Sequence, residues 1–177
     1  MDFLNNKKTF LSKIDKSRKG SIDSHIVDLI DKINELDYYY STSSCSGRIV
    51  LLKEAESGRK DEAKWIFVSH ELVDYKKINE AISKIDDKKN IWFKFEPPII
   101  HVACNKLESA QKLLDIARPL FKLSGIISTS KNIVEIRGTD RIDVPVAAVS
   151  DFNLLIKEAN SKMENGWKKL HEFELNL

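Results

Sequence analysis

Late in the chain, three short segments alternate apolar and polar residues as β-strands do, with no helical pattern between them. They lie near residues 125–130, 132–138 and 141–148. Regular alternation of strand and helix builds doubly wound parallel sheets, and two strand–strand junctions in a row do not fit that plan. We therefore expect an α+β fold, with a mixed or largely antiparallel sheet and helices packed on it, and not a Rossmann fold.

The remaining elements follow from hydrophobic spacing. Helices are expected over 2–16, after an N-cap at Ser21 (with Ile22 among its inward residues), after an N-cap at Asp74, over 107–117, and over about 151–165 with Gly166 as the C′ residue. Strands are expected over 48–53, 64–70, 91–96 and 99–104. Simple alternation over 64–70 puts Trp65, Phe67 and Ser69 on one face. The pair Pro97-Pro98 must interrupt the ladder, because proline has no N–H to donate.

Length and composition predict one soluble domain spanning residues 1–177. The apolar fraction of 42% suffices for a normal core, and no run approaches the roughly 18 apolar residues of a membrane span. The N-terminus lacks the apolar centre of a signal peptide. The two cysteines, Cys45 and Cys104, form neither a disulfide framework nor a metal-binding CxxC pair. A reducing cytoplasm is the expected location, with no membrane partner.

Charge is spread unevenly along the chain. The formal net charge is +2, but the first twenty residues carry six basic side chains against Asp2 and Asp15. The basic residues are Lys7, Lys8, Lys13, Lys16, Arg18 and Lys19. This end suits a phosphate backbone, but an ordinary solvated helix face is the simpler reading of a charge run alone.

Several familiar sites are excluded by the sequence. The six glycines form neither GxGxxG nor GxxxxGK[ST], so a Rossmann dinucleotide site and a P-loop are both unsupported. The run Ser44-Cys45-Ser46-Gly47 is not the GxSxG elbow of hydrolases. Cys45, His70, His101 and Cys104 lack zinc-ligand spacing, so no metal is expected.

Small hydroxyl residues gather in the run from Ser41 to Arg48, which leads directly into an apolar segment. Many hydroxyl donors next to a fixed positive charge suit an anion or a polar ligand, and we interpret Ser43 to Arg48 as a ligand-binding loop. Cys45 is either a nucleophile activated by a nearby histidine or a small residue packed in a tight turn.

Other candidates have two readings each. Glu96 and His101 flank the proline bend and suit proton transfer, or they are a surface carboxylate and a satisfied histidine. Glu135 and Arg137 share a strand face, and an exposed ion pair is the simpler reading. Trp65 is either a platform for an unpaired base or, as for most strand aromatics, a core residue.

Together these residues resemble the tRNA wybutosine-synthesising protein 3 family. The resemblance begins at Asp15-Lys16-Ser17-Arg18-Lys19-Gly20-Ser21-Ile22-Asp23 and is most specific in Ser43-Ser44-Cys45-Ser46-Gly47-Arg48-Ile49. It continues through Trp65, Ser69-His70 and Glu96-Pro97-Pro98-Ile99-Ile100-His101-Val102 to Ser124-Gly125, Ile136-Arg137 and Pro145. The chain departs mildly from the family pattern at 120–123 and at Pro98.

The resemblance implies a tRNA methyltransferase that uses S-adenosylmethionine. Such an enzyme methylates N-4 of the demethylated wyosine-type base at position 37 of phenylalanine tRNA. The alternative is a non-catalytic module that binds the modified anticodon loop or other enzymes of the pathway. The glycine pattern predicts that any donor site is unconventional.

The resemblance also implies roles for individual residues. His101, Glu96 and His70 are the candidate catalytic residues, one of them handling the proton. Candidates for binding substrate or cofactor are Ser43, Ser44, Cys45, Ser46, Gly47, Arg48, Trp65, Ser124, Gly125 and Arg137. Lys16, Ser17, Arg18 and Lys19 are expected to meet the anticodon stem-loop of the tRNA. The sequence fixes neither the donor's place, nor the proton acceptor, nor the pathway intermediate, nor the oligomeric state.

Overall fold

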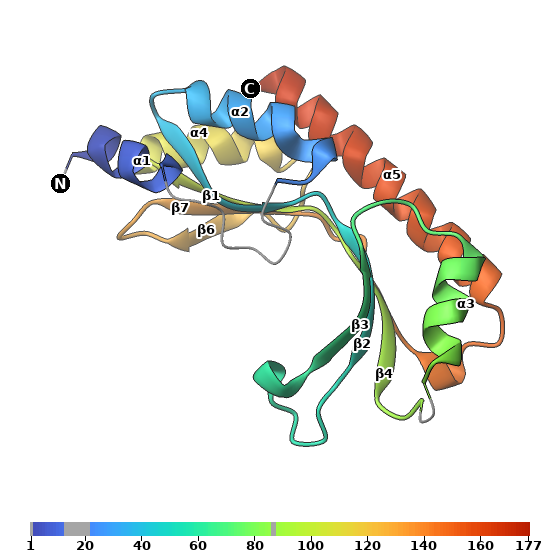
Figure 1. The fold of residues 1–177 in the computed structure, drawn as a ribbon. Helices are drawn as coiled ribbons and strands as arrows, with labels where there is room; N and C mark the ends of the chain where they lie inside the picture. Colours follow the sequence, from blue (N-terminus) through green and yellow to red (C-terminus); the bar gives the residue numbers. More distant parts are fainter. Residues whose placement is uncertain (1, 13–21, 86–87) are drawn as a thin grey trace. The chain divides into compact units, whose positions relative to one another are not determined.

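The computed structural model describes residues 2–12, 22–85 and 88–177. Within these residues it contains five α-helices, three short 3-10 helices and eight strands (Figure 1). Every strand pair is antiparallel, which confirms the predicted α+β class. The strands form two four-stranded sheets where the sequence led us to expect one.

The chain divides into two compact units, each built on one sheet. Unit 1 comprises residues 1–46, 98–139 and 166–177, and unit 2 comprises residues 47–97 and 140–165. The single domain over 1–177 stays a prediction. No helix in the described ranges is long and apolar enough to cross a membrane.

Unit 1 is a sheet covered by helices on one face. Its elements are α1 (Phe3–Leu11), η1 (Ser24–Ile26), α2 (Val27–Glu35), β1 (Tyr39–Cys45), β5 (Ile99–Cys104), α4 (Leu107–Ala117), β6 (Gly125–Ser128), β7 (Ile133–Arg137) and the second half of α5 (Phe152–Asn176). The strand order is β1-β5-β7-β6. Figure 1 shows α2, α4 and the end of α5 on the same face of this sheet.

The core of unit 1 lies between that face and its helices. Ile33, Val102, Leu113, Val134 and Phe173 are among its fully buried side chains. Beside the start of β1, α1 packs two phenylalanines, Phe3 and Phe10, against Tyr40, with ring centres 5.3 and 5.5 Å apart. Burial of the apolar helix faces supplies the main favourable term for this layer.

Unit 2 repeats the plan with a second sheet. Its elements are β2 (Arg48–Lys53), η2 (Lys60–Glu62), β3 (Lys64–Ser69), α3 (Tyr75–Ser83), β4 (Ile91–Glu96), β8 (Ile142–Pro145), η3 (Val146–Ala148) and the first half of α5. The strand order is β3-β2-β4-β8. Ile78 on α3, Phe93 and Phe95 on β4, and Met163 on α5 are fully buried. Figure 1 shows α3 and the first half of α5 on one side of this sheet.

Polar contacts fix the start of α3. The Asp74 side chain accepts a hydrogen bond from the Lys77 N–H at 2.8 Å, so the predicted N-cap is confirmed. One residue earlier, the Asn160 amide on α5 accepts from the Val73 N–H at 3.0 Å and donates to the Val73 carbonyl at 2.7 Å. The segment before α3 is therefore held to α5 through its backbone.

The predicted end of the last helix is wrong. α5 continues through Gly166 to Asn176. Gly166 is buried, and a Cβ built on it would lie 3.0 Å from both Cγ and Cδ of Pro98. The glycine therefore permits close packing inside a helix and is not a C′ residue.

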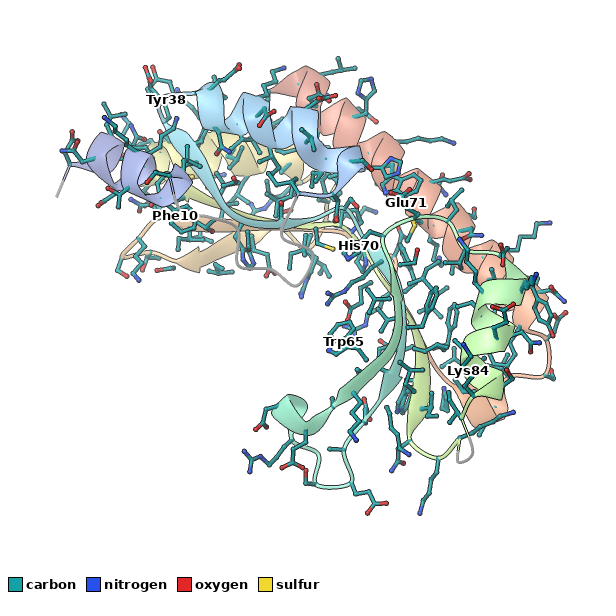
Figure 2. All side chains as sticks on the ribbon, viewed as in Figure 1. Phe10, Tyr38, Trp65, His70, Glu71 and Lys84 are labelled. Atoms are coloured by element: carbon teal, nitrogen blue, oxygen red, sulfur yellow. The ribbon has the colours of Figure 1, made fainter. Side chains whose placement is uncertain are left out.

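The predicted faces of β3 are also wrong. Leu51 pairs with Phe67 and Leu52 pairs with Trp65, with a register shift between them. Because neighbouring residues of β2 point to opposite faces, Trp65 and Phe67 do so as well; a β-bulge at Ile66 breaks the simple alternation. Figure 2 places Trp65 on the side of the sheet opposite α3, and it is 36% exposed, so it is not a core residue.

The second helix begins later than predicted. Ile22 precedes the helical segment and is 40% exposed, and regular α-helix starts only at Val27. The predicted N-cap Ser21 and the predicted end of the first helix, at residue 16, lie outside the described residues. Strands 48–53, 91–96 and 99–104 are confirmed, and 141–148 divides into β8 and η3.

Candidate functional site

The hydroxyl-rich run is a strand and not a loop. Ser41 to Cys45 belong to β1, Arg48 begins β2, and only Ser46 and Gly47 join them. Pairing with β5 satisfies the backbone groups that a loop would leave to solvent. Gly47 has φ 102°, in the left-handed region where a side chain is strained.

A bulge at Thr42 turns Ser43 toward His101. Ser41 pairs with Val102 and Ser43 pairs with His101, with a register shift between them. Val102 faces the helices and His101 faces the other way, so the extra residue moves Ser43 to the face that carries His101. Asn34 accepts hydrogen bonds from the Ser41 N–H at 2.8 Å and the Ser41 hydroxyl at 3.2 Å, beside the bulge.

Three polar side chains then lie side by side across three strands. We call Ser43 on β1, His101 on β5 and Glu135 on β7 the polar row; each is the register partner of the next. The Ser43 Oγ lies 2.8 Å from His101 Nδ1, and His101 Nε2 lies 2.9 Å from Glu135 Oε2. Both ring nitrogens of His101 are therefore engaged.

Arg137 borders the polar row. Its Nε lies 3.5 Å from Glu135 Oε1, which confirms the expected pair, but the Glu135 side chain is only 18% exposed. The Arg137 Nε is buried and makes no hydrogen bond to the described residues. The Nε therefore faces Glu135, and the remainder of the guanidinium, on a side chain that is 43% exposed, is the part suited to an anionic ligand group.

The rest of the run is divided between the two faces. Ser44 pairs with Ile100 and so faces the helices, away from the polar row. Ser46 is buried, and its N–H and hydroxyl donate to Asp23 Oδ2 at 2.9 and 3.1 Å. Cys45 pairs with Ile99, is partly exposed, and shares the face of the polar row.

Ser124 and Gly125, at the start of the edge strand β6, have different structural roles. Ser124 is buried, and its hydroxyl donates to the Phe121 carbonyl at 2.6 Å, so in this structure it holds a turn. Gly125 is the register partner of Glu135. A Cβ built on Gly125 meets no described atom within 4 Å, so the glycine leaves space beside Glu135.

Unit 2 brings together three other predicted residues on its uncovered face. Arg48 and Glu96 are register partners, and the Arg48 Nε donates to Glu96 Oε2 at 2.5 Å. The guanidinium carbon of Arg48 lies 4.5 Å from the centre of the Trp65 ring. The pair is partly buried, with 31% and 30% of the two side chains exposed. A flat, partly exposed indole with a cation over it is suited to stacking against a planar ligand.

A second ionic cluster lies on the same face. Lys94, the register partner of Asp143, contacts it at 3.0 Å, and Arg141 also pairs with Asp143. Burial alone would raise the pKa of Asp143, but the hydrogen bonds from Arg141 and Lys94 outweigh it and hold that pKa below its ordinary value. The Lys94 ammonium also lies 5.2 Å from the centre of the Trp92 ring.

His70 is the last of the predicted residues that the structure describes. His70 follows the end of β3 in unit 2 and is partly exposed. Lys16, Ser17, Arg18 and Lys19 fall outside the described residues. A cavity of about 700 Å³ in unit 2, lined by Lys53, Phe67, Lys77 and Lys84 among others, contains none of the predicted site residues.

Glu135 is the residue that the sequence interpretation missed. Its spacing of two residues from Arg137 indicates that both share one face of a strand. The local pattern does not indicate which other strand pairs with that strand. Only the pairing of β5 with β7 sets Glu135 against His101.

The sequence also matches a known protein family. The model of the family described as methyltransferase TYW3 matches residues 5–177. This chain belongs to the methyltransferase TYW3 family. The resemblance stated from the sequence motifs is thereby confirmed.

Members of the TYW3 family resemble this chain over most of its length. A protein of Thermococcus sibiricus named tRNA(Phe) 7-((3-amino-3-carboxypropyl)-4-demethylwyosine(37)-N(4))-methyltransferase is 38% identical, over 97% of this chain and 91% of its own. The Homo sapiens tRNA wybutosine-synthesizing protein 3 homolog is 34% identical, over 92% of this chain and 67% of its own. A solved protein from Pyrococcus horikoshii superposes with a TM-score of 0.88 at 37% identity, covering 98% of this chain and 95% of that one.

Proposed function

We propose that this protein transfers a methyl group from S-adenosylmethionine to N-4 of the demethylated wyosine-type base at position 37 of tRNA(Phe). The observation that carries the proposal is the match of the TYW3 family model to residues 5–177. The name of the Thermococcus relative, 91% of which the chain covers, supports the substrate. The absence of a membrane-spanning helix in the described ranges is compatible with the proposed cytoplasmic location.

The polar face of unit 1 fits the methyl donor in one respect. The Arg137 side chain is 43% exposed, and a carboxylate, such as that of an amino-acid group, is a partner that a guanidinium binds through two parallel hydrogen bonds. We assign Arg137 to that carboxylate, with Ser43 and Gly125 lining the same face. When bound, the donor supplies an electrophilic methyl group on a sulfonium.

The chain's own residues must orient the base and take its proton. His101 is the proposed proton acceptor, because its ring is partly exposed and held at both nitrogens. Trp65 with Arg48 is the proposed stacking site for an unpaired base of the anticodon loop. Glu96 acts at this stacking site by holding Arg48. His70 remains a proposed candidate for handling the proton. Lys16 to Lys19 are proposed to approach the anticodon stem-loop.

The experiment is methyl transfer by the purified protein. Transfer RNA that carries the demethylated base is incubated with labelled donor, and the digested nucleosides are identified by mass spectrometry. We expect one labelled methyl group on the tricyclic base of tRNA(Phe). Absence of transfer would refute the proposal, and calorimetry that finds tRNA affinity without donor affinity would establish the non-catalytic binding module instead.

Two variants sharpen the assignment. Arg48→Ala should weaken tRNA binding about tenfold, the effect of about one lost stacking or charged contact. Cys45→Ala should keep substantial methylation, because we expect Cys45 to shape the strand end and not to act as a nucleophile. Complete loss of transfer in Cys45→Ala, with the fold intact by circular dichroism, would contradict that role.

A further inference from the structure

The polar row of unit 1 runs from an exposed hydroxyl to a largely buried carboxylate. We propose that Glu135 is a positioning residue that fixes the tautomer of His101, so that His101 receives the proton of the substrate through the Ser43 hydroxyl. This inference rests on the proposed methyl transfer and adds Ser43 as a catalytic residue and Glu135 as its support. The 2.8 and 2.9 Å contacts on the two sides of the ring carry it.

The backbone is built to place Ser43 on this row. Without the bulge at Thr42, Ser43 would lie on the face of Ser41, which is 9% exposed and directed toward the helices. The bulged Thr42 hydroxyl donates to the His101 carbonyl at 3.3 Å. Asn34 binds the neighbouring Ser41 N–H. Bulges that turn a side chain occur frequently beside active sites.

Glu135 decides which ring nitrogen of His101 carries the hydrogen. An ionised carboxylate only accepts hydrogen bonds, so Nε2 must be the donor at 2.9 Å. In the neutral ring Nδ1 is then an acceptor, and the Ser43 hydroxyl donates to it at 2.8 Å. The hydroxyl is thus oriented to pass its proton to His101.

Exposure rises along the row from Glu135 to Ser43. Glu135 is 18% exposed and His101 28%, whereas Ser43 is an exposed residue. A substrate therefore meets Ser43 first, and the carboxylate acts only through the ring. The Arg137 Nε lies 3.5 Å from Glu135 Oε1, so Arg137 and the ring of His101 contact the two different oxygens of the carboxylate.

The proposed step conserves protons and charge. The ring nitrogen N-4 attacks the sulfonium methyl group; the new N–C bond forms while the C–S bond breaks and its electron pair stays on sulfur. The N-4 proton passes to the Ser43 oxygen as the Ser43 hydroxyl proton passes to His101 Nδ1. The product side holds a neutral methylated base, a thioether, a restored serine and an imidazolium beside Glu135. No further reactant is required.

Ionisable side chains of two neighbouring strands share the face of His101. On its face, the described groups that ionise include Glu135 and Arg137 on β7, and Tyr40 and Cys45 on β1. Gly125 and Ser128 on β6 carry no charge. Changes in Glu135 and Arg137 should therefore dominate any shift in the pH–rate profile of His101.

The first test reads the tautomer directly and needs no activity. Protein labelled with ¹⁵N-histidine, with the His101 signal assigned by loss in His101→Gln, should show a neutral ring protonated on Nε2. Glu135→Gln should give a mixture of both tautomers, because an amide either accepts from or donates to the ring. A ring protonated on Nδ1 in the wild-type protein would overturn the inference.

The second test measures single-turnover methylation at saturating donor and tRNA. General acid–base catalysis contributes about 10²- to 10⁴-fold, so His101→Gln should lose about a hundredfold or more. Ser43→Ala and Glu135→Gln should each lose about tenfold or more, with tRNA affinity within about twofold of wild type. Glu135→Asp should recover part of the rate.

We call the proton transfer through Ser43 to His101 the relay. Control variants distinguish loss of the relay from loss of folding and from failure of the proposed function. Glu108→Gln removes an exposed carboxylate on α4, and Ser128→Ala removes a hydroxyl on β6; both should stay within about twofold of wild type. The wild-type rate should level off at high pH, whereas the His101→Gln rate should keep rising as hydroxide replaces the missing base. Full rates in folded Glu135→Gln or Ser43→Ala, with an active wild type, would overturn the relay alone. Inactivity of the wild type would refute the methyltransferase and the relay together.

Discussion

At the scale of single residues, Gly166 reveals a constraint that outweighs helix propensity. A glycine in a helix interior costs about 1 kcal/mol relative to alanine. Gly166 is nevertheless in the middle of α5, because Cγ and Cδ of Pro98 lie 3.0 Å from the place of a Cβ. Pro98 is buried, and its carbonyl accepts from the Gly138 N–H at 3.4 Å, so the ring has little freedom to withdraw.

Gly166→Ala should therefore destabilise the protein, against the sign expected from helix propensity. We expect a loss of about 1–3 kcal/mol in the free energy of unfolding, typical of overpacking a filled site, measured by urea denaturation. In a Pro98→Ala background the same change should be neutral or stabilising, since the ring carbons are gone. Ser161→Ala, at an exposed position of α5, is the control. Stabilisation by Gly166→Ala in the wild-type background would contradict the packing argument.

At the candidate site, the sequence analysis singled out residues by the chemistry of their own side chains. Ser43, His101 and Arg137 were singled out from the sequence, and the structure gathers them on one face of unit 1. Glu135 was interpreted as half of an exposed ion pair, because a local pattern shows which residues share a face but not which strand lies beside it. Hydrogen bonding across strands is a property of pairing, and pairing is set by the whole core.

At the scale of elements, alternation predicted β2, β4 and β5 with the observed bounds. It failed where a strand holds an extra residue. The bulges at Thr42 and Ile66 leave no sign in hydrophobicity, yet each reverses the face of the residues beyond it. For this reason simple alternation put Trp65 on the same face as Phe67, and the structure places them on opposite faces.

The predicted and observed N-cap of α3 offers a test at this scale. Asp74→Ala removes the acceptor for the Lys77 N–H and should lower the free energy of unfolding by about 1 kcal/mol. Asp74→Asn keeps the acceptor oxygen and should lose far less. Chemical denaturation of both variants gives the comparison, and equal losses would show that the cap bond contributes nothing specific.

At the scale of the whole molecule, the sequence predicted the class but not the number of sheets. Alternating apolar and polar residues indicate strands. How the strands divide between two sheets depends on where the chain passes from one hydrogen-bonded sheet to the other. The links at Ser46-Gly47, Pro97-Pro98 and Thr139-Asp140 are the places where it does so. The proline pair was recognised as an interruption of one ladder, and the structure makes it the boundary between two.

Global stability should fall at alkaline pH because of a buried thiol. Burial raises the pKa of Cys104 from its ordinary value of 9.0 to about 12. Between these values the unfolded chain releases the thiol proton and the folded chain keeps it. The contribution of the thiol is therefore complete below about pH 9 and is lost as pH rises toward 12, by up to about 1.4 kcal/mol per pH unit.

Denaturation curves from pH 8 to 11.5 measure this effect. Burial, with a smaller contribution from Cys104, also raises the pKa of the Tyr39 phenol, so part of the decline remains in Cys104→Ala. The difference between wild type and Cys104→Ala reports the thiol together with its effect on Tyr39: the variant should have the shallower decline above pH 9. Identical slopes for the two proteins would contradict the assignment to Cys104.

The interleaving of the two units imposes an order on biosynthesis. The core of unit 1 includes Ile33 from near the start of the chain and Phe173 from beyond the last segment of unit 2. A ribosome therefore makes every residue of unit 2 before it makes the side chains that complete unit 1. The polar row belongs to the unit that is begun first and finished last, so a nascent chain holds Ser43, His101 and Glu135 before the layer behind their sheet is complete.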